Sequence, residues 1–385
     1  MNAPANRTYE HCREWVKMGM DVTVITCVPN FPAGKVFPGY KNKLYQKEFI
    51  DGIKVIRVWS FITANTGTFK RIVDYISFAF MAFIISIFVR TELIIATSPQ
   101  FFTAIAGRLS SFLKRKPWVM EVRDIWPESI VAVGAMKKSK AISLLEKIEK
   151  HLYKSATKIV VVTDSFKENI IQKGIDPKKI YVIKNGVYID KFKPIPKDLS
   201  VIEKLNLREK FVLAYFGTHG MAHRLDFILK CAKNIQDPEI HILFIGDGAE
   251  RENLMKLKEE LSLTNVTMLY SVPKNEIQNF ISIIDVALVT LKKSDTFKSV
   301  IPSKIFENAA MNKPIFLGVE GESKDLVENY NVGLCFEPEN EKDFLGKLNV
   351  IKMNTLNKIY IDGCIRMTKD FDRVNLAHKM IEAIK

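Results

Sequence analysis

Residues 211–220 read FVLAYFGTHG, and residues 241–248 read HILFIGDG. Each stretch is a run of apolar residues that ends in a glycine, and each precedes a segment whose apolar residues recur about every 3.6 positions. Solid apolar strands that alternate with helices are typical of parallel strands covered on both faces. The pattern predicts a doubly wound α/β domain, in which ligands bind at the carboxyl ends of the strands.

The same alternation extends over the chain, and 385 residues are enough for two domains. Residues 191–209, KFKPIPKDLSVIEKLNLRE, have two prolines, many charges and no strand pattern, which indicates a linker. We therefore expect two doubly wound domains that face each other across a cleft. The further strands are predicted at residues 22–27, 53–59, 93–97, 119–122, 158–162, 180–184, 266–269, 286–289 and 314–317.

The chain opens with a helical pattern at residues 8–17, where a doubly wound domain ordinarily opens with a strand. The first strand is usually central in such a sheet, so its absence would leave a gap. We expect that the first strand of the N-terminal domain is missing and that the natural protein begins about 15–20 residues upstream. The alternative is that another strand fills this place.

Charge is distributed unevenly along the chain, whose formal net charge is +14. Residues 1–200 hold 32 basic and 17 acidic residues, a net +15, and the remainder holds 25 basic and 26 acidic residues, a net −1. The first half is therefore expected to face a polyanion, either an anionic membrane surface or a nucleic acid. Five scattered cysteines without a C-x-x-C pair argue against a disulfide framework and a cysteine zinc site.

Residues 75–89, YISFAFMAFIISIFV, carry no charge. As a helix this segment would reach about 22 Å, whereas the hydrocarbon core of a bilayer is about 30 Å thick. We expect a helix buried inside a domain. Shallow docking in the membrane interface is the alternative, and a full span is disfavoured.

Glycine turns at strand ends in the second half indicate an anion site, because glycines let backbone N–H groups approach a phosphate. Within residues 301–307, IPSKIFE, Ser303 is expected to cap a helix whose first residue is Lys304. Lys304 would address a phosphate, and Glu307 on the same helical face would accept hydrogen bonds from a ribose diol. The other residues expected to line this nucleotide pocket are Gly217, Thr218, His219, Gly220, Gly246, Asp247, Gly248, Ser271, Val272, Pro302 and Ser303.

Polar residues also follow strands in the first half. Arg123, Asp124 and Glu128 come after residues 119–122, and Asn185 follows residues 180–184. We expect these side chains to contact a polar acceptor at the cleft, with a structural Arg123–Asp124 ion pair as the alternative.

His219 and His223 lie four residues apart, a spacing that metal ligands use on a helix. No further His or Cys is near them in the sequence, so we favour phosphate contact and expect no metal site.

Several of these segments resemble glycosyltransferase family 4, in the order in which that family has them. Residues 185–194, NGVYIDKFKP, are similar to its NGVD-x-x-x-F-x-P hinge signature. Its donor-domain motifs are similar to FIGDGAERENL (244–254), NVTMLYSVP (265–273), DVALVTL (285–291) and PSKIFENAAMNKPI (302–315). In the first half, APANRTYEHCREWVKMGMDVTVIT (3–26) and VRDIWPES (122–129) resemble a branch that builds bacterial O-antigens and capsules, close to the L-fucosamine-type (amino-deoxysugar) transferases.

The resemblance implies a GT-B fold of two Rossmann-like domains. With the linker, this gives an acceptor and membrane-facing domain at residues 1–192, a linker at 193–208, a nucleotide-sugar domain at 209–370 and a C-terminal helix at 371–385 that returns to the first domain. It also implies retaining, metal-independent transfer of a UDP-linked N-acetylated amino or deoxyamino sugar, with no cofactor. The acceptor would be an undecaprenyl-diphosphate-linked glycan of lipopolysaccharide O-antigen or capsule biosynthesis.

The same resemblance implies a cytoplasmic enzyme at the inner face of the plasma membrane. Its partners would be the nucleotide-sugar donor, the lipid-linked acceptor and the anionic membrane surface. No nucleic acid is expected, because no basic–aromatic RNA motif or recognition helix is evident.

The sequence departs from the family pattern at three places. The family's E-x7-E pair would begin at position 299, where this chain has Ser299, so that only Glu307 of the pair is present. Thr218 and His223 stand at the family's Arg and Lys positions, so Lys304, Arg224 and backbone N–H groups would meet the diphosphate. The family's N-terminal strand and its glycine-rich loop are absent from the sequence.

The expected mechanism places Glu307 on the donor ribose and Lys304 on the leaving diphosphate, where developing charge needs stabilisation. Two alternatives stay open. One is a nucleotide-sugar 2-epimerase of the same architecture, which needs no lipid acceptor. The other is an inactive, truncated remnant.

Overall fold

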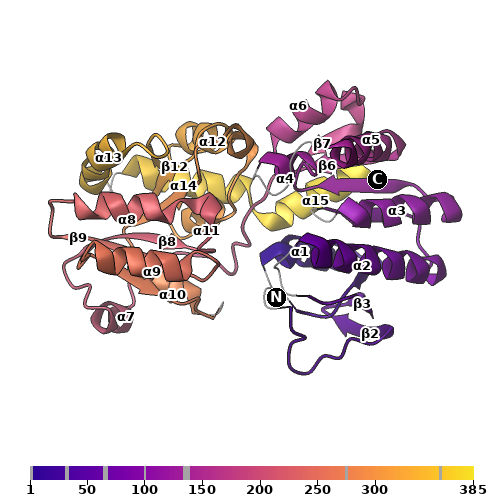
Figure 1. Cartoon of the computed structure of the whole chain (residues 1–385), viewed down its shortest axis with the longest axis horizontal. Helices are drawn as coiled ribbons and strands as arrows, with labels where there is room; N and C mark the ends of the chain where they lie inside the picture. Colours follow the sequence, from indigo (N-terminus) through magenta and orange to yellow (C-terminus); the bar gives the residue numbers. More distant parts are fainter. Residues whose placement is uncertain are drawn as a thin grey trace. The chain divides into compact units, whose positions relative to one another are not determined.

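The structure is a computed structural model that describes residues 3–30, 34–63, 68–98, 101–132, 139–273, 276–354 and 358–385. The chain divides into two compact units, the first made of Met1–Lys184 with Val374–Lys385 and the second of Asn185–Arg373. Both units contain sheets of parallel strands with helices between them, so the predicted α/β fold of two Rossmann-like units is confirmed (Figure 1).

The second unit contains a six-stranded sheet in the order β10-β9-β8-β11-β12-β13, and all of its pairs are parallel. This is the strand order of the doubly wound dinucleotide-binding fold. Its first three strands are added toward one edge of the sheet, and the fourth returns to the other side of the first. Residues of β8 and β11 are almost all buried, as continuous apolar runs require. The strands are β8 (Phe211–Phe216), β9 (Ile240–Ile245), β10 (Val266–Leu269), β11 (Val286–Thr290), β12 (Ile315–Gly318) and β13 (Gly333–Cys335).

Helices cover both faces of this sheet. They are α8 (Leu225–Lys233), α9 (Arg251–Glu260), α10 (Ile277–Ile283), α11 (Lys304–Ala310), α12 (Glu322–Tyr330), α13 (Glu341–Asn354) and α14 (Lys358–Asp370), with the short 3-10 helices η2 (Met221–His223) and η3 (Asp295–Ser299).

The segment predicted as a linker, residues 193–208, is part of the second unit. It contains α7 (Leu199–Lys204), whose first turn is capped by the Asp198 carboxylate, which accepts from the N–H groups of Ser200 and Val201. Val201 and Leu207 are buried in the core of the unit. The prolines and charges of the segment masked a short helix, and Asp198 was the N-cap signal for it.

The strands of the first unit form two separate sheets. One is β4-β5-β6-β7, entirely parallel, and the other is β1-β3-β2, in which β2 runs antiparallel to β3. Among the described strands, β1 and β4 each have a single neighbour, so the strands do not join into one sheet. The strands are β1 (Thr23–Thr26), β2 (Tyr45–Ile50), β3 (Ile53–Val58), β4 (Ile94–Thr97), β5 (Trp118–Val122), β6 (Lys158–Val161) and β7 (Ile180–Val182).

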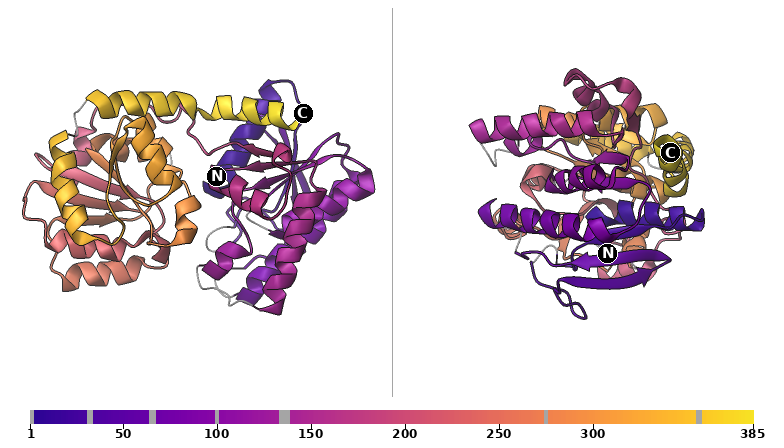
Figure 2. Two further views of the ribbon diagram at one scale, coloured as in Figure 1. Left: turned by 90° about the horizontal axis from the view of Figure 1, so that it is seen from above. Right: turned by 90° about the vertical axis from the view of Figure 1, so that its right-hand side faces the viewer.

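The C-terminal helix α15 (Arg373–Ile384) packs in the first unit. Its ribbon is the yellow end of the chain in Figure 2. Trp15 donates its indole N–H to the Ala377 carbonyl at 2.9 Å, and Leu376 and Met380 lie in the same apolar core as Ile53 of β3. The other helices of the unit are α1 (Ala3–Lys17), α2 (Thr68–Phe88), α3 (Phe101–Lys114), α4 (Glu128–Ala132), α5 (Lys140–Ser155), α6 (Asp164–Gln172) and the 3-10 helix η1 (Pro177–Lys179).

The expectation that the apolar segment 75–89 is buried inside a domain is wrong. The segment lies in α2, and only 11% of the window Lys70–Phe88 is buried. Among the described side chains of α2, Ala79 alone is classed as buried. Within the described part of the chain, α2 is the one helix that is long and apolar enough to cross a membrane, judged by length and composition alone. A helix that is apolar on all sides predicts burial, but α2 uses only part of its circumference for packing.

Candidate functional site

Two glycine turns of the second unit interlock at the carboxyl ends of β8 and β9. The N–H of Gly217 donates to the Ile245 carbonyl at 2.9 Å, and the N–H of His219 donates to the Asp247 carbonyl at 2.9 Å. The structure thus brings together the predicted segments 217–220 and 246–248. They lie beside the point where the strand order reverses between β8 and β11, where ligands bind in sheets of this kind.

Glycine is required at two of these positions because the turns touch each other through their backbones. A Cβ atom on Gly246 would lie 1.8 Å from the Gly217 carbonyl oxygen, and one on Gly248 would lie 2.4 Å from that of His219. Gly217 and Gly248 have φ angles of 137° and 157°. Side chains are therefore excluded where the two turns meet.

Lys304, the first residue of α11, lies close to the Gly217 turn. Helix α11 follows β11, on the other side of the point where the strand order reverses. The Lys304 Nζ lies 3.7 Å from the centroid of the Tyr215 ring, and it would be 3.1 Å from a Cβ on Gly217. Burial lowers the pKa of Lys304 to about 7, which the nearby Glu307 carboxylate partly opposes. An ammonium group stripped of water and placed over an aromatic face is suited to bind an anion at the turn.

Tyr215 was not predicted from the sequence and connects the parts of this site. It is fully buried, and its hydroxyl donates to the Thr218 carbonyl at 2.8 Å. Its ring centroid lies 6.2 Å from that of His219 and 5.6 Å from that of His223. The available signal was a hydroxyl near the end of an otherwise apolar strand, since a buried tyrosine hydroxyl needs a partner.

His219 and His223 are held neutral around neutral pH. Burial, with a contribution from Arg251, lowers the pKa of His219 to about 4, and burial, with a contribution from Lys304, lowers that of His223 to about 3. His219 is 0% exposed, and neither ring nitrogen has a hydrogen-bond partner within the described structure. Within the described ranges, no three His, Cys, Asp or Glu side chains gather as a metal site would require.

Arg224, which the sequence predicts to meet the diphosphate, is paired with two carboxylates. It pairs with Asp226 at 3.0 Å and also with Glu339. A second arginine, which the sequence analysis missed, supports the turns: Arg251 donates to the Gly246 and Leu269 carbonyls at 3.2 and 2.9 Å. It therefore ties the ends of β9 and β10 together.

The start of α11 differs from the prediction in one detail. Lys304 is the first helical residue as expected, but Ser303 already has helical angles, φ −59° and ψ −26°, and its hydroxyl caps no N–H in the described structure. Glu307 lies in the first turn of α11 and is half-buried. Pro302 precedes Ser303, and Ser271 and Val272 follow the end of β10.

The predicted acceptor residues are divided between the two units. Arg123 and Asp124 follow β5 in the first unit, and Asp124 accepts a hydrogen bond from Ser129 at 3.1 Å while burial raises its pKa. Glu128 begins α4 and lies 3.6 Å from Lys173. Asn185 is the first residue of the second unit.

Glu121, the acidic residue at the end of β5, has a structural role. Its carboxylate lies 2.8 Å from the Nε of Arg7, and Arg7 also donates to the Lys184 and Ile183 carbonyls at 2.8 and 2.9 Å. Burial alone would raise the pKa of Glu121, but the charges of Arg7, Arg123 and His11 lower it to about 2.

Comparisons with known proteins agree with this geometry. Residues 2–186 match the family model described as glycosyl transferase 4-like domain, and residues 200–359 match glycosyl transferases group 1. The chain is 29% identical over 220 residues to a probable glycosyltransferase, WbjE, of Pseudomonas aeruginosa, which covers 56% of this chain and 55% of the relative. The chain thus spans about half the length of the first curated relatives that it matches.

A further relative is the UDP-Gal:alpha-D-GlcNAc-diphosphoundecaprenol alpha-1,3-galactosyltransferase of Escherichia coli, 29% identical over 287 residues, 70% of this chain and 64% of the relative. Among solved structures, HepE of Anabaena with UDP and glucose has a TM-score of 0.69 at 17% identity, covering 87% of this chain and 86% of that chain. Sucrose-phosphate synthase of Thermosynechococcus elongatus has a TM-score of 0.78 at 15% identity, covering 99% and 92%. The fold, the interlocked glycine turns and the two matched domains together show that the chain belongs to the GT-B glycosyltransferases of family 4.

Proposed function

We propose that this chain is a retaining glycosyltransferase that moves a sugar from a UDP-linked donor, an N-acetylated amino or deoxyamino sugar, to an undecaprenyl-diphosphate-linked glycan. Its products would enter O-antigen or capsule biosynthesis. Two similar proteins support the donor and acceptor classes, since one is named for UDP-Gal and a diphosphoundecaprenol acceptor and the other was solved in complex with UDP and glucose.

The observation that carries this proposal is the position of Lys304. Its ammonium group lies against the Tyr215 ring and the Gly217 turn, and burial there lowers its pKa to about 7. A diphosphate bound at the turn would add negative charge beside this ammonium group, whose burial Glu307 offsets only in part. The site therefore favours a ligand that brings negative charge, as a nucleotide-sugar does.

The proposed reaction follows from these groups. Glu307 accepts hydrogen bonds from the donor ribose, and Lys304 stabilises the charge that develops on the leaving diphosphate. The bond from the anomeric carbon to the diphosphate oxygen breaks, and a bond to the acceptor hydroxyl forms on the same face of the sugar. The acceptor proton passes to the leaving phosphate oxygen, so the chain supplies no separate base. Arg123 and Asp124 are proposed to hold the acceptor.

The proposed location is the cytoplasmic face of the plasma membrane, where the chain would be a peripheral protein. The net +15 of residues 1–200 supports this, because the inner leaflet is anionic.

The test of the donor site is Lys304→Met, which removes the charge and keeps the length of the side chain. We expect UDP binding, measured by isothermal titration calorimetry at pH 6.5, to weaken at least about tenfold, as loss of a charge-assisted contact implies. The melting temperature without UDP should not fall, because burying an ammonium group costs stability. Lys324→Met, at an exposed lysine of α12, is the matched control and should bind UDP like the wild type. Equal UDP affinity in Lys304→Met would refute the site.

The reaction itself is tested with UDP-sugars in the presence and absence of a lipid-linked acceptor. Transfer with retained anomeric configuration supports the proposal. Consumption of the donor without acceptor, with an epimer as product, would instead establish the epimerase.

A further inference from the structure

Large apolar side chains are exposed where α2 and α3 end. Phe88 of α2 is 80% exposed, and Phe112 and Leu113 of α3 are 66% and 56% exposed. Ile87 is 37% exposed. We call these four residues the helix-end patch. Folded proteins rarely expose contiguous aromatic and aliphatic surface unless it binds something.

The patch is continuous because the two helices are joined at this end. The hydroxyls of Ser86 in α2 and Ser110 in α3 lie 2.6 Å apart, and Lys114 donates from Nζ to the Ile87 carbonyl at 2.9 Å. The last turns of both helices therefore present their apolar side chains together.

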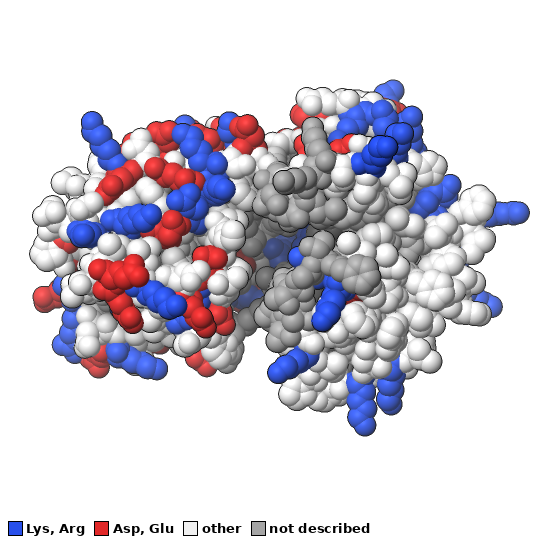
Figure 3. Space-filling model, in the orientation of Figure 1, with Lys and Arg blue, Asp and Glu red and all other residues white. Residues whose placement is uncertain are grey.

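Basic residues surround the helix-end patch. Arg90 follows α2, and Lys114, Arg115 and Lys116 end α3 and follow it. Between residues 75 and 117 the sequence has five Lys or Arg and a single acid, Glu92. Figure 3 shows the same imbalance on the first unit, at the right, where blue side chains stand among white atoms with little red.

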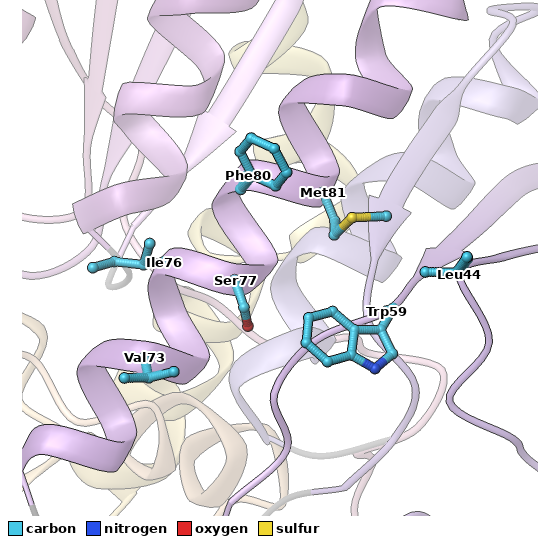
Figure 4. Close-up of a pocket in the computed structure, with 7 residues that line it drawn as sticks. All are labelled: Leu44, Trp59, Val73, Ile76, Ser77, Phe80 and Met81. Carbon is cyan, nitrogen blue, oxygen red and sulfur yellow. The ribbon is translucent and has the colours of Figure 1, made fainter.

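An apolar pocket of about 530 Å³ lies further along α2. Figure 4 shows Phe80 and Met81 of α2 near Trp59, which follows β3, and Leu44, which precedes β2. Its size is that of a small-molecule site. The remaining lining residues, Val73, Ile76 and Ser77, belong to α2.

We propose that the helix-end patch and the α2 pocket form a docking surface for an anionic phospholipid bilayer, with the patch inserted at the level of the acyl chains and a lipid chain in the pocket. Apolar side chains ringed by cations are the chemistry of an interfacial segment, because the cations bind lipid phosphates while the rings enter the hydrocarbon. This inference rests on the proposed membrane association and assigns the surface that makes it.

The hydrogen bonds of α2 require that it lies on the membrane and does not cross it. Ser77, in the middle of the helix, accepts from the Phe61 N–H at 2.8 Å, and Ser86 and Ile87 bond to α3 near its C-terminal end. A spanning helix would break these contacts and carry Lys70, Arg71 and Asp74 toward the hydrocarbon.

The first experiment is sedimentation with vesicles of phosphatidylcholine and with vesicles that contain about 30% phosphatidylglycerol, the second being favoured by lysine and arginine. We expect the full chain to bind the anionic vesicles. The double variant Phe88→Ser, Phe112→Ser should bind them at least about tenfold more weakly, because each ring loses apolar contact area. Leu144→Ser on α5, where the leucine is 58% exposed, is the matched control and should bind like the wild type.

The second experiment reads the pocket through Trp59. Phospholipids brominated on the acyl chains should quench part of the tryptophan fluorescence, and Trp59→Phe should remove that part. Of the other three tryptophans, Trp15 and Trp118 are only 7% and 1% exposed, so they add little to the lipid-dependent signal. Trp126 is half-buried, and any quenching of it remains in Trp59→Phe and is subtracted by that comparison.

Two outcomes would overturn the inference. One is equal vesicle binding by the patch double variant and the wild type. The other is a wild-type dimer in solution that the double variant abolishes, which would assign the patch to a second copy. The vesicles contain neither UDP nor acceptor. A chain that binds UDP but no vesicles would therefore contradict the docking surface and leave the proposed function standing. A chain that binds vesicles but no UDP would contradict the proposed function and leave the docking surface standing.

Discussion

At the scale of single residues, desolvation gives the candidate site its chemistry. Lys304 lies over Tyr215 and beside the Gly217 backbone, where few groups can solvate an ammonium ion. Its pKa of about 7 therefore reflects burial, which the nearby Glu307 carboxylate only partly opposes. His219 and His223 are neutral near pH 7, so they add no positive charge beside Lys304.

This pKa predicts that UDP binding takes up a proton. At pH 8 the UDP phosphates are ionised and Lys304 is largely neutral in the free protein, so the bound diphosphate should draw a proton onto it. At pH 6 the lysine is already charged, so Lys304 should take up no proton, and affinity should fall as the pH rises through 7. Titration calorimetry in two buffers with different ionisation enthalpies measures this uptake. Uptake at pH 8 that persists in Lys304→Met would assign it to another group.

At the scale of elements, a buried ion pair fastens α1 to the sheet of the first unit. Arg7 of α1 is 2% exposed and Glu121 of β5 is 4% exposed, and Arg7 also binds the carbonyls that follow β7. Forming such a pair costs free energy because both charges lose their water. Removing only one partner destabilises the protein much more, because the other charge then stays buried without a counter-charge.

We predict that Arg7→Met lowers the free energy of unfolding by about 3–5 kcal/mol at pH 7. Arg7→Met, Glu121→Leu should recover most of the loss, since it removes both charges. The wild-type pair contributes its stability above the unfolded pKa of a glutamate and loses it as the pH falls toward 2, because the folded pKa is lowered. In Arg7→Met the destabilisation relative to the wild type should become smaller as the pH falls, because the unpaired Glu121 carboxylate becomes protonated and neutral. Urea denaturation at pH 7 and pH 5 measures both effects, and a double variant as unstable as the single one would contradict them.

At the scale of the whole molecule, the two halves differ in charge while they share a fold type. The +15 of residues 1–200 and the −1 of the remainder place the attraction for anionic surfaces in the first unit. The proposed donor site lies in the second unit, at the point where the order of its strands reverses. The proposed membrane contact and the proposed nucleotide binding therefore belong to different units.

This separation predicts a characteristic salt dependence. Raising NaCl from about 0.1 M to about 1 M shortens the Debye length from about 10 Å to about 3 Å. Binding to anionic vesicles should weaken strongly, yet some should persist through the apolar patch. The Phe88→Ser, Phe112→Ser variant should lose its residual binding entirely in high salt. Vesicle sedimentation across a salt series is the measurement, and salt-independent binding by the wild type would contradict the charge argument.

The sequence by itself determined the fold class, the positions of most buried strands and the segments that form the two interlocked glycine turns. Buried parallel strands are continuous apolar runs, and glycine is required where two backbones touch, so both leave a mark in the local sequence. β2 escaped prediction because its residues alternate between exposed and half-buried at a sheet edge.

Only the tertiary structure decided which residues meet. The contact of Lys304 with Tyr215, the compensation of Arg224 by Glu339 and the pair of Arg7 with Glu121 join residues far apart in the chain. The same holds for α2, whose composition predicts burial and whose side chains are largely exposed. Local composition states what a segment is able to bury, whereas the neighbours that the fold supplies decide what it does bury.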